Sequence, residues 1–185
     1  MVQSPLWRFH RIAGTHASRW DELREHGPIP EMRWDPHPPP RGDHPGIGVS
    51  YASPFIETAV AEKFQGQRVV YLTADQALTG WMPTRPLALL GLAGEWELRN
   101  GASASLGAQP KSVCRAWAQT IHETWPDLDG LLVKSTMTGR SSVVLFSPAA
   151  DSFPDYPLLS TPLDQWQASS IIIPIAKRYG WPVAR

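Results

Sequence analysis

The sequence is poor in cysteine, in long apolar runs and in net charge. Cys114 is the single cysteine among 185 residues, which excludes an internal disulfide and any zinc site built from several cysteines. The longest stretch without Asp, Glu, Lys or Arg is His44–Ile56, which is only partly apolar, so we expect no membrane-spanning helix. The 17 basic and 17 acidic residues cancel, which argues against direct binding to nucleic-acid phosphates or acidic lipid.

Several common targeting and catalytic motifs are also missing. Met1–His10 holds no apolar run of the kind that signal peptides contain, so we expect a cytoplasmic protein. No glycine-rich phosphate loop and no GxSxG elbow occurs, and the 6 histidines form no close ligand pair on a helix. His37, Asp43 and His44 could meet across one loop, but solvated loop residues are the simpler interpretation. We therefore expect no metal.

What the sequence has in excess is proline and tryptophan. The 19 prolines gather in residues 28–45 and 148–162, which predicts short elements joined by long loops, because proline resists helix interiors. The 9 tryptophans are scattered, which favours core anchors and pocket walls over one aromatic strip. With 42% hydrophobic residues, a chain of this length forms one domain with a substantial core.

Apolar patterns predict strands in clusters with a few helices between them. The expected strands are Leu6–Ile12, Gly48–Ala52, Arg68–Thr73, Pro86–Leu92, Leu131–Val133 and Val143–Phe146. The expected helices are Ala17–His26, Pro54–Gln65 and Pro110–Trp125, with a further helix start at Thr161–Asp164. This order indicates an α+β domain rather than a doubly wound sheet.

One predicted helix carries a charged group beside its apolar face. Ser53 is a suitable cap and Pro54 suits the first helical position. Phe55, Ala59 and Glu62 follow at a spacing that puts them on one face of the helix. A carboxylate next to an apolar stripe is a candidate functional group.

Four polar residues stand in an order and spacing that resemble the RES-domain family, which is named for its Arg, Glu and Ser. They are Arg33 in Arg-Trp-Asp, Tyr51 in Ser-Tyr-Ala, Glu62 in Ala-Val-Ala-Glu, and Ser135 after a strand that begins Asp-Gly. The family typically reads Gly-Arg-Trp-Asn, Tyr-Thr-Ala, Ala-Leu-Leu-Glu, and an Asp-Gly strand ending in Ser. No single motif is specific, so their order and spacing carry the resemblance.

Further matches extend the resemblance over Leu6–Ala150. Leu6–Arg8 resembles the opening Leu-Tyr-Arg of the family, and Ser142–Phe146 supplies its last strand. The chain departs from the pattern at Met32, where glycine is usual, and in a longer, proline-rich segment before Tyr51.

The resemblance implies a fold like that of the ADP-ribosyltransferase toxins. It would be a single domain of two small sheets flanked by helices, with NAD bound as a substrate in a cleft between the sheets. Residues 6–150 would form the catalytic domain, and residues 151–185 a C-terminal extension packed on it. The resemblance also implies a bacterial toxin that depletes NAD and is neutralised by an antitoxin protein.

The residue types suit this chemistry. Breaking the nicotinamide–ribose bond develops positive charge on the sugar, which the carboxylate of Glu62 would stabilise. Arg33 offers a planar fork of donors for the pyrophosphate or ribose, and Tyr51 could stack on the nicotinamide ring. The hydroxyl of Ser135 could bond a ribose or the amide, and Arg8 is a candidate second phosphate contact.

Each of these residues also has an ordinary structural interpretation. The alternatives are ion pairing of Arg33 with Glu31 or Asp35, a surface hydroxyl for Tyr51, pairing of Glu62 with Lys63 or Arg68, and a strand-end cap for Ser135. Four matches in order favour the functional interpretation. Arg140 with its neighbouring glycine and serines could bind phosphate, although an exposed hairpin tip is the simpler interpretation.

Three functions remain open at this point. The first is cleavage of NAD at the nicotinamide bond, with ADP-ribose passed to water or phosphate. The second is an ADP-ribosyltransferase that modifies a host protein, which the sequence does not separate from the first because the acceptor depends on loop shape. The third is a non-catalytic domain that binds a nucleotide or a partner protein.

Overall fold

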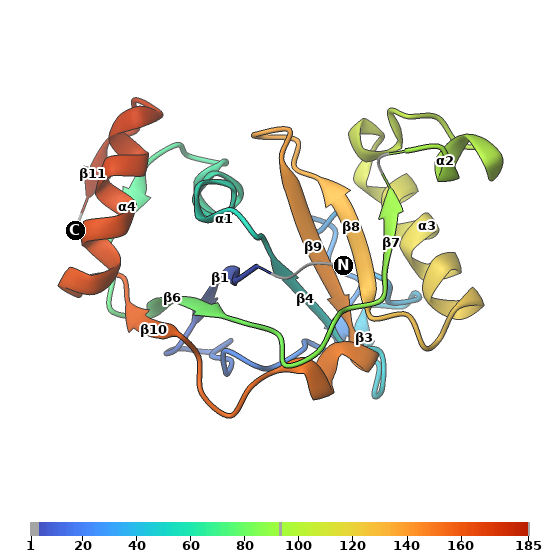
Figure 1. Ribbon diagram of the computed structural model, residues 1–185, viewed down its shortest axis with the longest axis horizontal. Coiled ribbons are helices and arrows are strands. Elements are labelled where there is room, and N and C mark those ends of the chain that lie inside the picture. The colour runs from blue at the N-terminus through green and yellow to red at the C-terminus, as the bar shows by residue number, and fades with distance from the viewer. Residues whose placement is uncertain (1–3, 93, 185) are drawn as a thin grey trace.

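Four strands rich in Val and Leu form the larger sheet, on the right of Figure 1. In the computed structural model, which describes residues 4–92 and 94–184, the order of these strands is β4–β9–β8–β7. Their bounds are Val49–Ala52 for β4, Leu89–Leu92 for β7, Gly130–Lys134 for β8 and Ser141–Phe146 for β9. β7 runs parallel to β8, and the other pairs are antiparallel. Tyr51 and Leu131 both lie opposite Val144, so the three side chains share one face.

A second sheet of three antiparallel strands lies on the left of Figure 1, in the order β1–β6–β10. Its strands are β1 at Leu6–Arg11, β6 at Gln76–Trp81 and β10 at Leu159–Pro162. The sequence patterns do not predict the central strand β6. Its Gly80 is required by packing, because a Cβ atom there would lie 2.5 Å from the ring of Trp7.

Two short two-stranded sheets accompany the two main ones. Antiparallel β2 (His26–Gly27) pairs with β3 (Gly42–Asp43), and β5 (Val70–Tyr71) pairs with β11 (Val183–Ala184) in parallel. The strand expected at Arg68–Thr73 is therefore much shorter, and Arg68 itself has a positive φ of 53°.

Helices cover the outer faces of both sheets and the space above them (Figure 1). Their bounds are Ile56–Phe64 for α1, Trp96–Arg99 for α2, Lys111–Thr124 for α3 and Trp166–Arg178 for α4, with short 3-10 turns at Leu106–Ala108 and Ser147–Ser152. α3 packs Cys114, Ala118 and Ile121 against the larger sheet. α1 and α4 share a core with the smaller sheet, in which Ile172 and Ile175 are buried. Pro174 is exposed on α4 and does not interrupt the helix.

The sequence predictions of class and of most elements are confirmed, and the fold is α+β. The helix predicted at Ala17–His26 is wrong, because this segment consists of turns and bends that lead into β2. The carbonyls of Trp20 and Glu22 accept hydrogen bonds from the Arg8 guanidinium, both at 3.0 Å, and the Arg24 amide donates to Val49. Tertiary contacts thus take backbone groups that a helix would need.

The beginning of α1 also differs from its prediction. The cap position is Phe55 and the first helical residue is Ile56, so Ser53 and Pro54 lie before the helix. The Ser53 hydroxyl still accepts a hydrogen bond from the Phe55 amide at 3.1 Å. Ser53 therefore stabilises the turn that leads into the helix rather than the helix itself.

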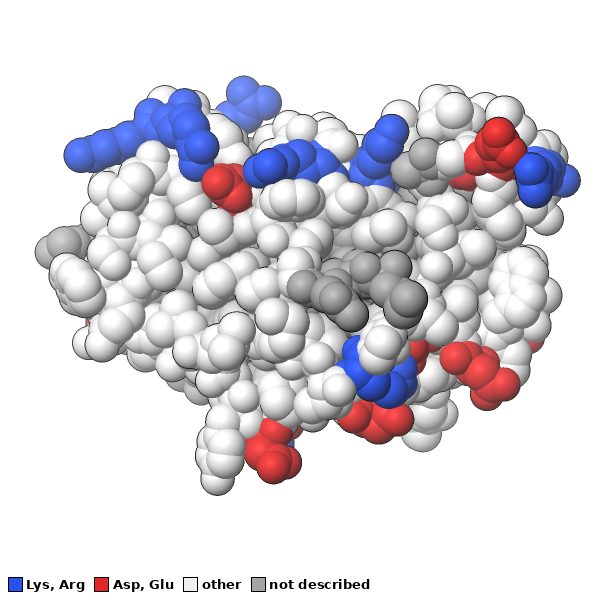
Figure 2. Space-filling view, in the orientation of Figure 1, with Lys and Arg blue, Asp and Glu red and all other residues white. Residues whose placement is uncertain are grey.

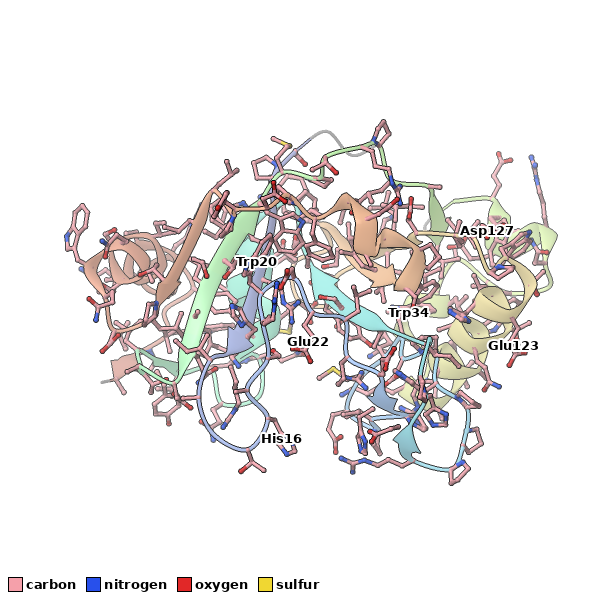
Figure 3. All side chains as sticks on the ribbon, turned by 90° about the horizontal axis from the view of Figure 1, so that it is seen from below. His16, Trp20, Glu22, Trp34, Glu123 and Asp127 are labelled. Carbon is pink, nitrogen blue, oxygen red and sulfur yellow. The ribbon has the colours of Figure 1, made fainter. Side chains whose placement is uncertain are left out.

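The segment between β1 and β4 passes beneath both sheets. In the view from below, Trp20 lies under the smaller sheet and Trp34 lies near β4 and α3, whereas His16 is at an outlying loop tip (Figure 3). Trp34 belongs to the core under α3, and Trp20 contacts the ring of Trp81. The two tryptophans anchor a proline-rich segment that has little regular structure of its own.

No helix within residues 4–92 and 94–184 combines the length and the apolar character needed to cross a membrane.

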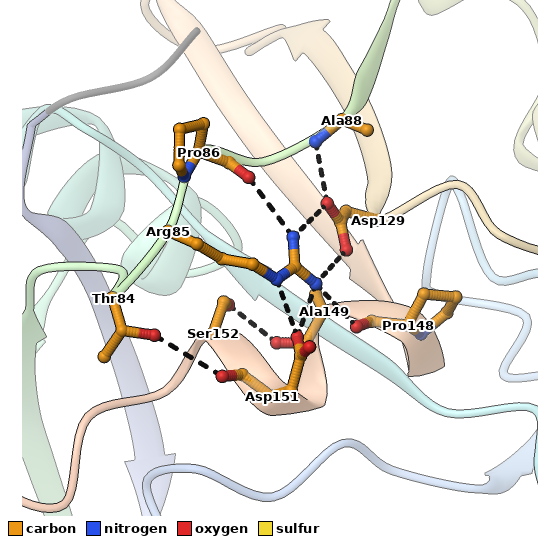
Figure 4. A network of polar contacts seen from close by, with 9 residues as sticks. All are labelled: Thr84, Arg85, Pro86, Ala88, Asp129, Pro148, Ala149, Asp151 and Ser152. Carbon is orange, nitrogen blue, oxygen red and sulfur yellow. Dashed lines mark hydrogen bonds and ion pairs between the residues drawn. The ribbon is translucent and has the colours of Figure 1, made fainter.

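Arg85 connects three segments at the lower end of the larger sheet (Figure 4). Its guanidinium donates two hydrogen bonds to the carboxylate of Asp129, at 2.7 and 2.8 Å, and Nε donates to Asp151 at 2.9 Å. It also donates to the carbonyls of Pro86 at 3.2 Å and Pro148 at 2.9 Å. This clamp fixes the residues that precede β7 and β8 and the turn after β9.

The clamp depends on the charge of a buried carboxylate. Burial alone would raise the pKa of Asp129, but hydrogen bonds from Arg85 and the Ala88 amide and the charge of Arg85 outweigh it and lower this pKa. The side chain of Asp129 is only 3% exposed. Its stabilising effect is therefore complete above the ordinary pKa of an aspartate and disappears as the pH falls through the lowered value.

We expect Arg85→Ala to lower the free energy of unfolding by about 2 kcal/mol, because it leaves a buried carboxylate with few partners. Urea unfolding at neutral pH measures this change. The matched control is Arg99→Ala, whose pair with Glu95 is more than three-quarters exposed and contributes only a few tenths of a kcal/mol. Equal, small effects in both variants would contradict a clamp at Arg85.

Candidate functional site

The structure joins two of the predicted site residues directly. Glu62 lies on α1, and Ser135 is the first residue after β8. The Ser135 hydroxyl donates a hydrogen bond to Oε1 of Glu62 at 2.5 Å, across 73 positions of sequence. Gln65 donates to the other carboxylate oxygen at 3.0 Å. The alternative pairing of Glu62 with Lys63 or Arg68 is not observed within the described residues.

Ser135 holds the tip of the β8–β9 hairpin together as well. Its hydroxyl accepts hydrogen bonds from the amides of Met137 at 3.1 Å and Thr138 at 3.2 Å, and its own amide donates to the Arg140 carbonyl at 2.8 Å. The Ser135 hydroxyl therefore caps the end of β8, as its structural interpretation predicts, and the same hydroxyl also contacts Glu62. Thr138 also bonds Thr58 of α1 at 2.9 Å between their hydroxyl oxygens, so the tip is attached to the helix at two points.

Tyr51 places its hydroxyl inside the protein and not at the surface, so the surface-hydroxyl alternative is wrong. The hydroxyl oxygen is buried and has no hydrogen-bond partner among the described residues. Burial raises the pKa of Tyr51, and the nearby negative charge of Asp35 raises it further. The residue as a whole is partly exposed, so its accessible part lies away from the hydroxyl. At neutral pH this hydroxyl keeps its proton.

Arg33 contacts the segment before α3 and the first part of that helix. Its Nη1 donates to the carbonyl of Gln109 and lies 3.6 Å from Sγ of Cys114. Pairing with Glu31 or Asp35, the structural alternative, is not observed in the described part of the chain. Within residues 4–92 and 94–184, Arg33 forms no hydrogen bond or ion pair with Glu62 or Ser135, so the structure does not bring these groups into direct contact.

Arg8, on β1 of the smaller sheet, has a separate set of partners in the segment that follows this strand. Its guanidinium donates to the carbonyls of Trp20 and Glu22, as described for the segment after β1. Burial lowers the pKa of Arg8 to about 10, and the charges of Glu22 and Asp21 oppose this shift in part. These contacts give Arg8 a structural role, and a contact with phosphate stays a prediction.

A buried charged cluster next to Arg33 was not expected from the sequence. Asp35 is fully buried and accepts hydrogen bonds from Arg24 at 2.9 Å, from the Ile29 amide at 2.8 Å and from His37. Burial alone would raise the pKa of Asp35, but hydrogen bonds from His37 and Ile29 and the charge of Arg24 lower it to about 2. The interpretation of His37 as a solvated loop residue is wrong, because His37 is 2% exposed. Only the fold brings these groups together.

Two cavities lie on either side of the hairpin tip. The larger has a volume of about 450 Å³ and is lined by residues that include Phe55, Gly91, Leu132, Lys134 and Arg140. The smaller, of about 180 Å³, is lined by Ala61, Arg68, Met137, Thr138, Tyr179 and Trp181. Neither of the two is lined by Arg33, Tyr51, Glu62 or Ser135.

The described residues contain no group of three or more His, Cys, Asp or Glu side chains that could hold a metal ion.

Comparisons with known proteins agree with this architecture. A family model described as RES domain matches residues 5–167. A chain in the crystal structure of the M. tuberculosis MbcT-MbcA toxin-antitoxin complex is similar in fold, with a TM-score of 0.57 and 15% sequence identity. The match covers 92% of this chain and 89% of that one. No curated protein matches the sequence.

Proposed function

The chain belongs to the RES-domain family, and from that premise we propose that it is an enzyme that breaks the bond between nicotinamide and ribose in NAD. The observation that carries this proposal is the hydrogen bond between Ser135 and Glu62. This bond identifies Glu62 as the carboxylate of the proposed site and fixes the position of one of its oxygens. The other side chains of the proposed site then follow from their places around this pair.

Cleavage of the nicotinamide bond places positive charge on the ribose carbon and its ring oxygen. A carboxylate held beside the sugar stabilises this charge, and a fixed position avoids reorganisation during the reaction. Ser135 and Gln65 each hold one oxygen of Glu62, at 2.5 and 3.0 Å. We therefore assign Glu62 as the charge-stabilising residue and Ser135 as its positioning residue.

Tyr51 and Arg33 have roles in binding in this proposal. The hydroxyl end of Tyr51 is buried in the protein, and the accessible part of its ring can stack on nicotinamide. Arg33 is partly exposed and uses Nη1 on protein groups, so the remaining N–H donors can bind the pyrophosphate or a ribose hydroxyl. Arg8 is the weaker candidate for a phosphate contact because both of its structural bonds hold a loop.

The catalytic domain in this proposal is residues 6–150, with residues 151–185 as an extension packed on it. The packing of the extension is supported by hydrogen bonds between the end of α4 and α1. Arg178 lies 3.3 Å from the carboxylate of Glu57, and the Tyr179 hydroxyl donates to the Glu57 carbonyl at 3.2 Å.

We further propose that the protein acts as a toxin with a protein antitoxin as its partner. The fold similarity to a chain of the MbcT-MbcA toxin-antitoxin complex supports this role. NAD serves as the substrate, and ADP-ribose passes to water or phosphate. Transfer to a side chain of a host protein is the alternative, since the same pocket chemistry serves either acceptor.

Induced expression in a bacterial host tests this function. We expect the wild-type chain to deplete cellular NAD and arrest growth. Mass spectrometry then separates the outcomes, because hydrolysis yields ADP-ribose, phosphorolysis its 1″-phosphate, and transfer a protein adduct. Unchanged NAD with full expression of folded protein would contradict the proposal.

We expect Ser135→Ala to lower kcat for nicotinamide release about tenfold, because the carboxylate of Glu62 loses the donor that orients it. Ser135→Thr keeps a hydroxyl and should restore most of the rate. Steady-state kinetics with thermal unfolding on the same samples separates this effect from a loss of folding. Equal rates for Ala and Thr variants would exclude a role for the hydroxyl.

A further inference from the structure

Two arginines connect the segment that carries Arg33 to the start of α3, and they do so in opposite directions. Nη1 of Arg33 donates a hydrogen bond to the carbonyl of Gln109, just before the helix. Nη1 of Arg115, in the second turn of α3, donates to the carbonyls of Pro30 at 2.8 Å and Met32 at 3.4 Å. Met32 directly precedes Arg33, so Arg115 holds the main chain from which the side chain of Arg33 extends.

Arg115 differs from the cations at the surface of the protein. Most of the basic side chains on the face shown in Figure 2 project from its upper edge into solvent. Arg115 is only partly exposed, and within the described part of the chain it forms no ion pair with a carboxylate. Its charge is therefore directed at main-chain carbonyls, where a charged donor forms a stronger hydrogen bond than a neutral one.

The main chain that Arg115 holds has few other supports. Residues 30–32 are exposed, whereas Trp34 is 3% exposed and belongs to the core under α3. The Met32 amide donates to the Ile29 carbonyl at 3.0 Å, which makes a turn but does not connect this turn to another element. The hydrogen bonds from Arg115 supply that connection.

Arg115 also lies near the second binding residue of the proposed site. Burial and the negative charge of Asp35 raise the pKa of Tyr51. The positive charges of Arg24 and Arg115 act in the opposite direction and lower this pKa in part. The side chain of Arg115 is thus close both to the hydroxyl of Tyr51 and to the main chain beside Arg33.

We propose that Arg115 is a positioning residue for the binding of NAD, which fixes Arg33 by holding the main chain beside it. This inference rests on the proposed function, because it requires Arg33 to bind the substrate. An arginine side chain that is held before the substrate arrives loses less freedom on binding, so the protein binds the substrate more tightly. Arg115 itself needs no contact with NAD, which separates it from the residues that bind or stabilise the substrate.

Steady-state kinetics of three variants tests this role. We expect Arg115→Met, which keeps most of the apolar stem and loses the donor, to raise KM for NAD about tenfold and to leave kcat within about twofold. A single nitrogen makes both hydrogen bonds, so Arg115→Lys should restore most of the wild-type KM. Lys111→Met is the matched control, because Lys111 is an exposed cation on the same helix, and its KM should equal that of the wild type. An unchanged KM in Arg115→Met, or equal defects in the two variants of Arg115, would contradict the proposal.

A chemical probe tests the same hold on Arg33 without any turnover. Cys114 is the single cysteine of the chain, and its buried thiol lies 3.6 Å from Nη1 of Arg33. If Arg115 keeps this segment in place, its loss should expose the thiol by local opening. We expect an aromatic disulfide reagent to label Cys114 at least about fivefold faster in Arg115→Met than in the wild type or in Arg115→Lys. Urea unfolding of the same samples shows that each variant is folded and how much labelling global unfolding contributes.

The two measurements separate the possible failures. No nicotinamide release by the wild type would reject the proposed function, and with it a role of Arg115 in NAD binding, whatever the labelling shows. Release by the wild type, together with labelling of Arg115→Met no faster than its global unfolding predicts, would overturn this inference alone.

Discussion

Glu62→Gln is expected to lower the rate of nicotinamide release about 10²- to 10³-fold, the range found when one preorganised electrostatic contact is removed from an active site. Glutamine keeps the size of the side chain and can still accept the hydrogen bond from Ser135. The variant therefore removes the negative charge and, at the second oxygen, the hydrogen bond from the exposed Gln65. We expect kcat to carry the loss, with KM for NAD little changed, because the charge acts on a transition state and not on the bound substrate.

Glu123→Gln is the matched control for this variant. Glu123 is an exposed carboxylate on α3 (Figure 3) that accepts a hydrogen bond from Gln119 at 2.8 Å, and among the described residues it forms no hydrogen bond with Arg33, Tyr51, Glu62 or Ser135. Its rate should equal that of the wild type. A full rate in Glu62→Gln would reject Glu62 as the charge-stabilising residue while leaving the family and the fold unaffected.

Asp35→Ala is expected to lower the free energy of unfolding by about 3 kcal/mol, because Arg24 and His37 would remain in the interior without their shared acceptor. The side chain of Arg24 is 29% exposed, which keeps the expected loss at the lower end of the range for buried pairs. Asp35 follows Arg33 and Trp34 directly, so the variant should also weaken NAD binding by loosening the segment that carries Arg33. Urea unfolding and KM for NAD measure the two effects separately.

The same carboxylate predicts a dependence of stability on pH. The pKa of Asp35 is lowered from 3.8 to about 2 in the folded protein. Its contribution is therefore complete above its unfolded pKa and disappears as the pH falls toward 2. The acid limb of the stability curve should flatten in Asp35→Asn, which cannot titrate. As a control, Asp127→Ala removes an exposed aspartate and should change the free energy of unfolding by less than about 0.5 kcal/mol.

The sequence predicts the helices and strands that have a clear local pattern of apolar residues. The strands around Val49–Ala52 and Ser141–Phe146 and the helices at Ile56–Phe64 and Lys111–Thr124 have clear apolar periodicity. The helix predicted at Ala17–His26 is wrong because its carbonyls bond to the side chain of a distant arginine. A local sequence pattern does not indicate contacts between residues that are far apart in the chain.

The candidate site was likewise predicted only in part from the sequence. The resemblance to the RES-domain family, carried by order and spacing, points to Glu62 and Ser135, and the structure joins them through one hydrogen bond. The cluster of Arg24, Asp35 and His37 was missed because its members lie in a segment without periodicity. Trp34 was the one local signal beside Asp35, since tryptophan is highly buried on average.

The measurement that tests the central claim most directly is nicotinamide release from NAD by the purified wild-type chain, followed by chromatography with and without phosphate and with no other protein present. We predict release by the wild type, with ADP-ribose or its 1″-phosphate as the second product. No release under either condition by correctly folded protein would contradict cleavage of NAD with water or phosphate as the acceptor.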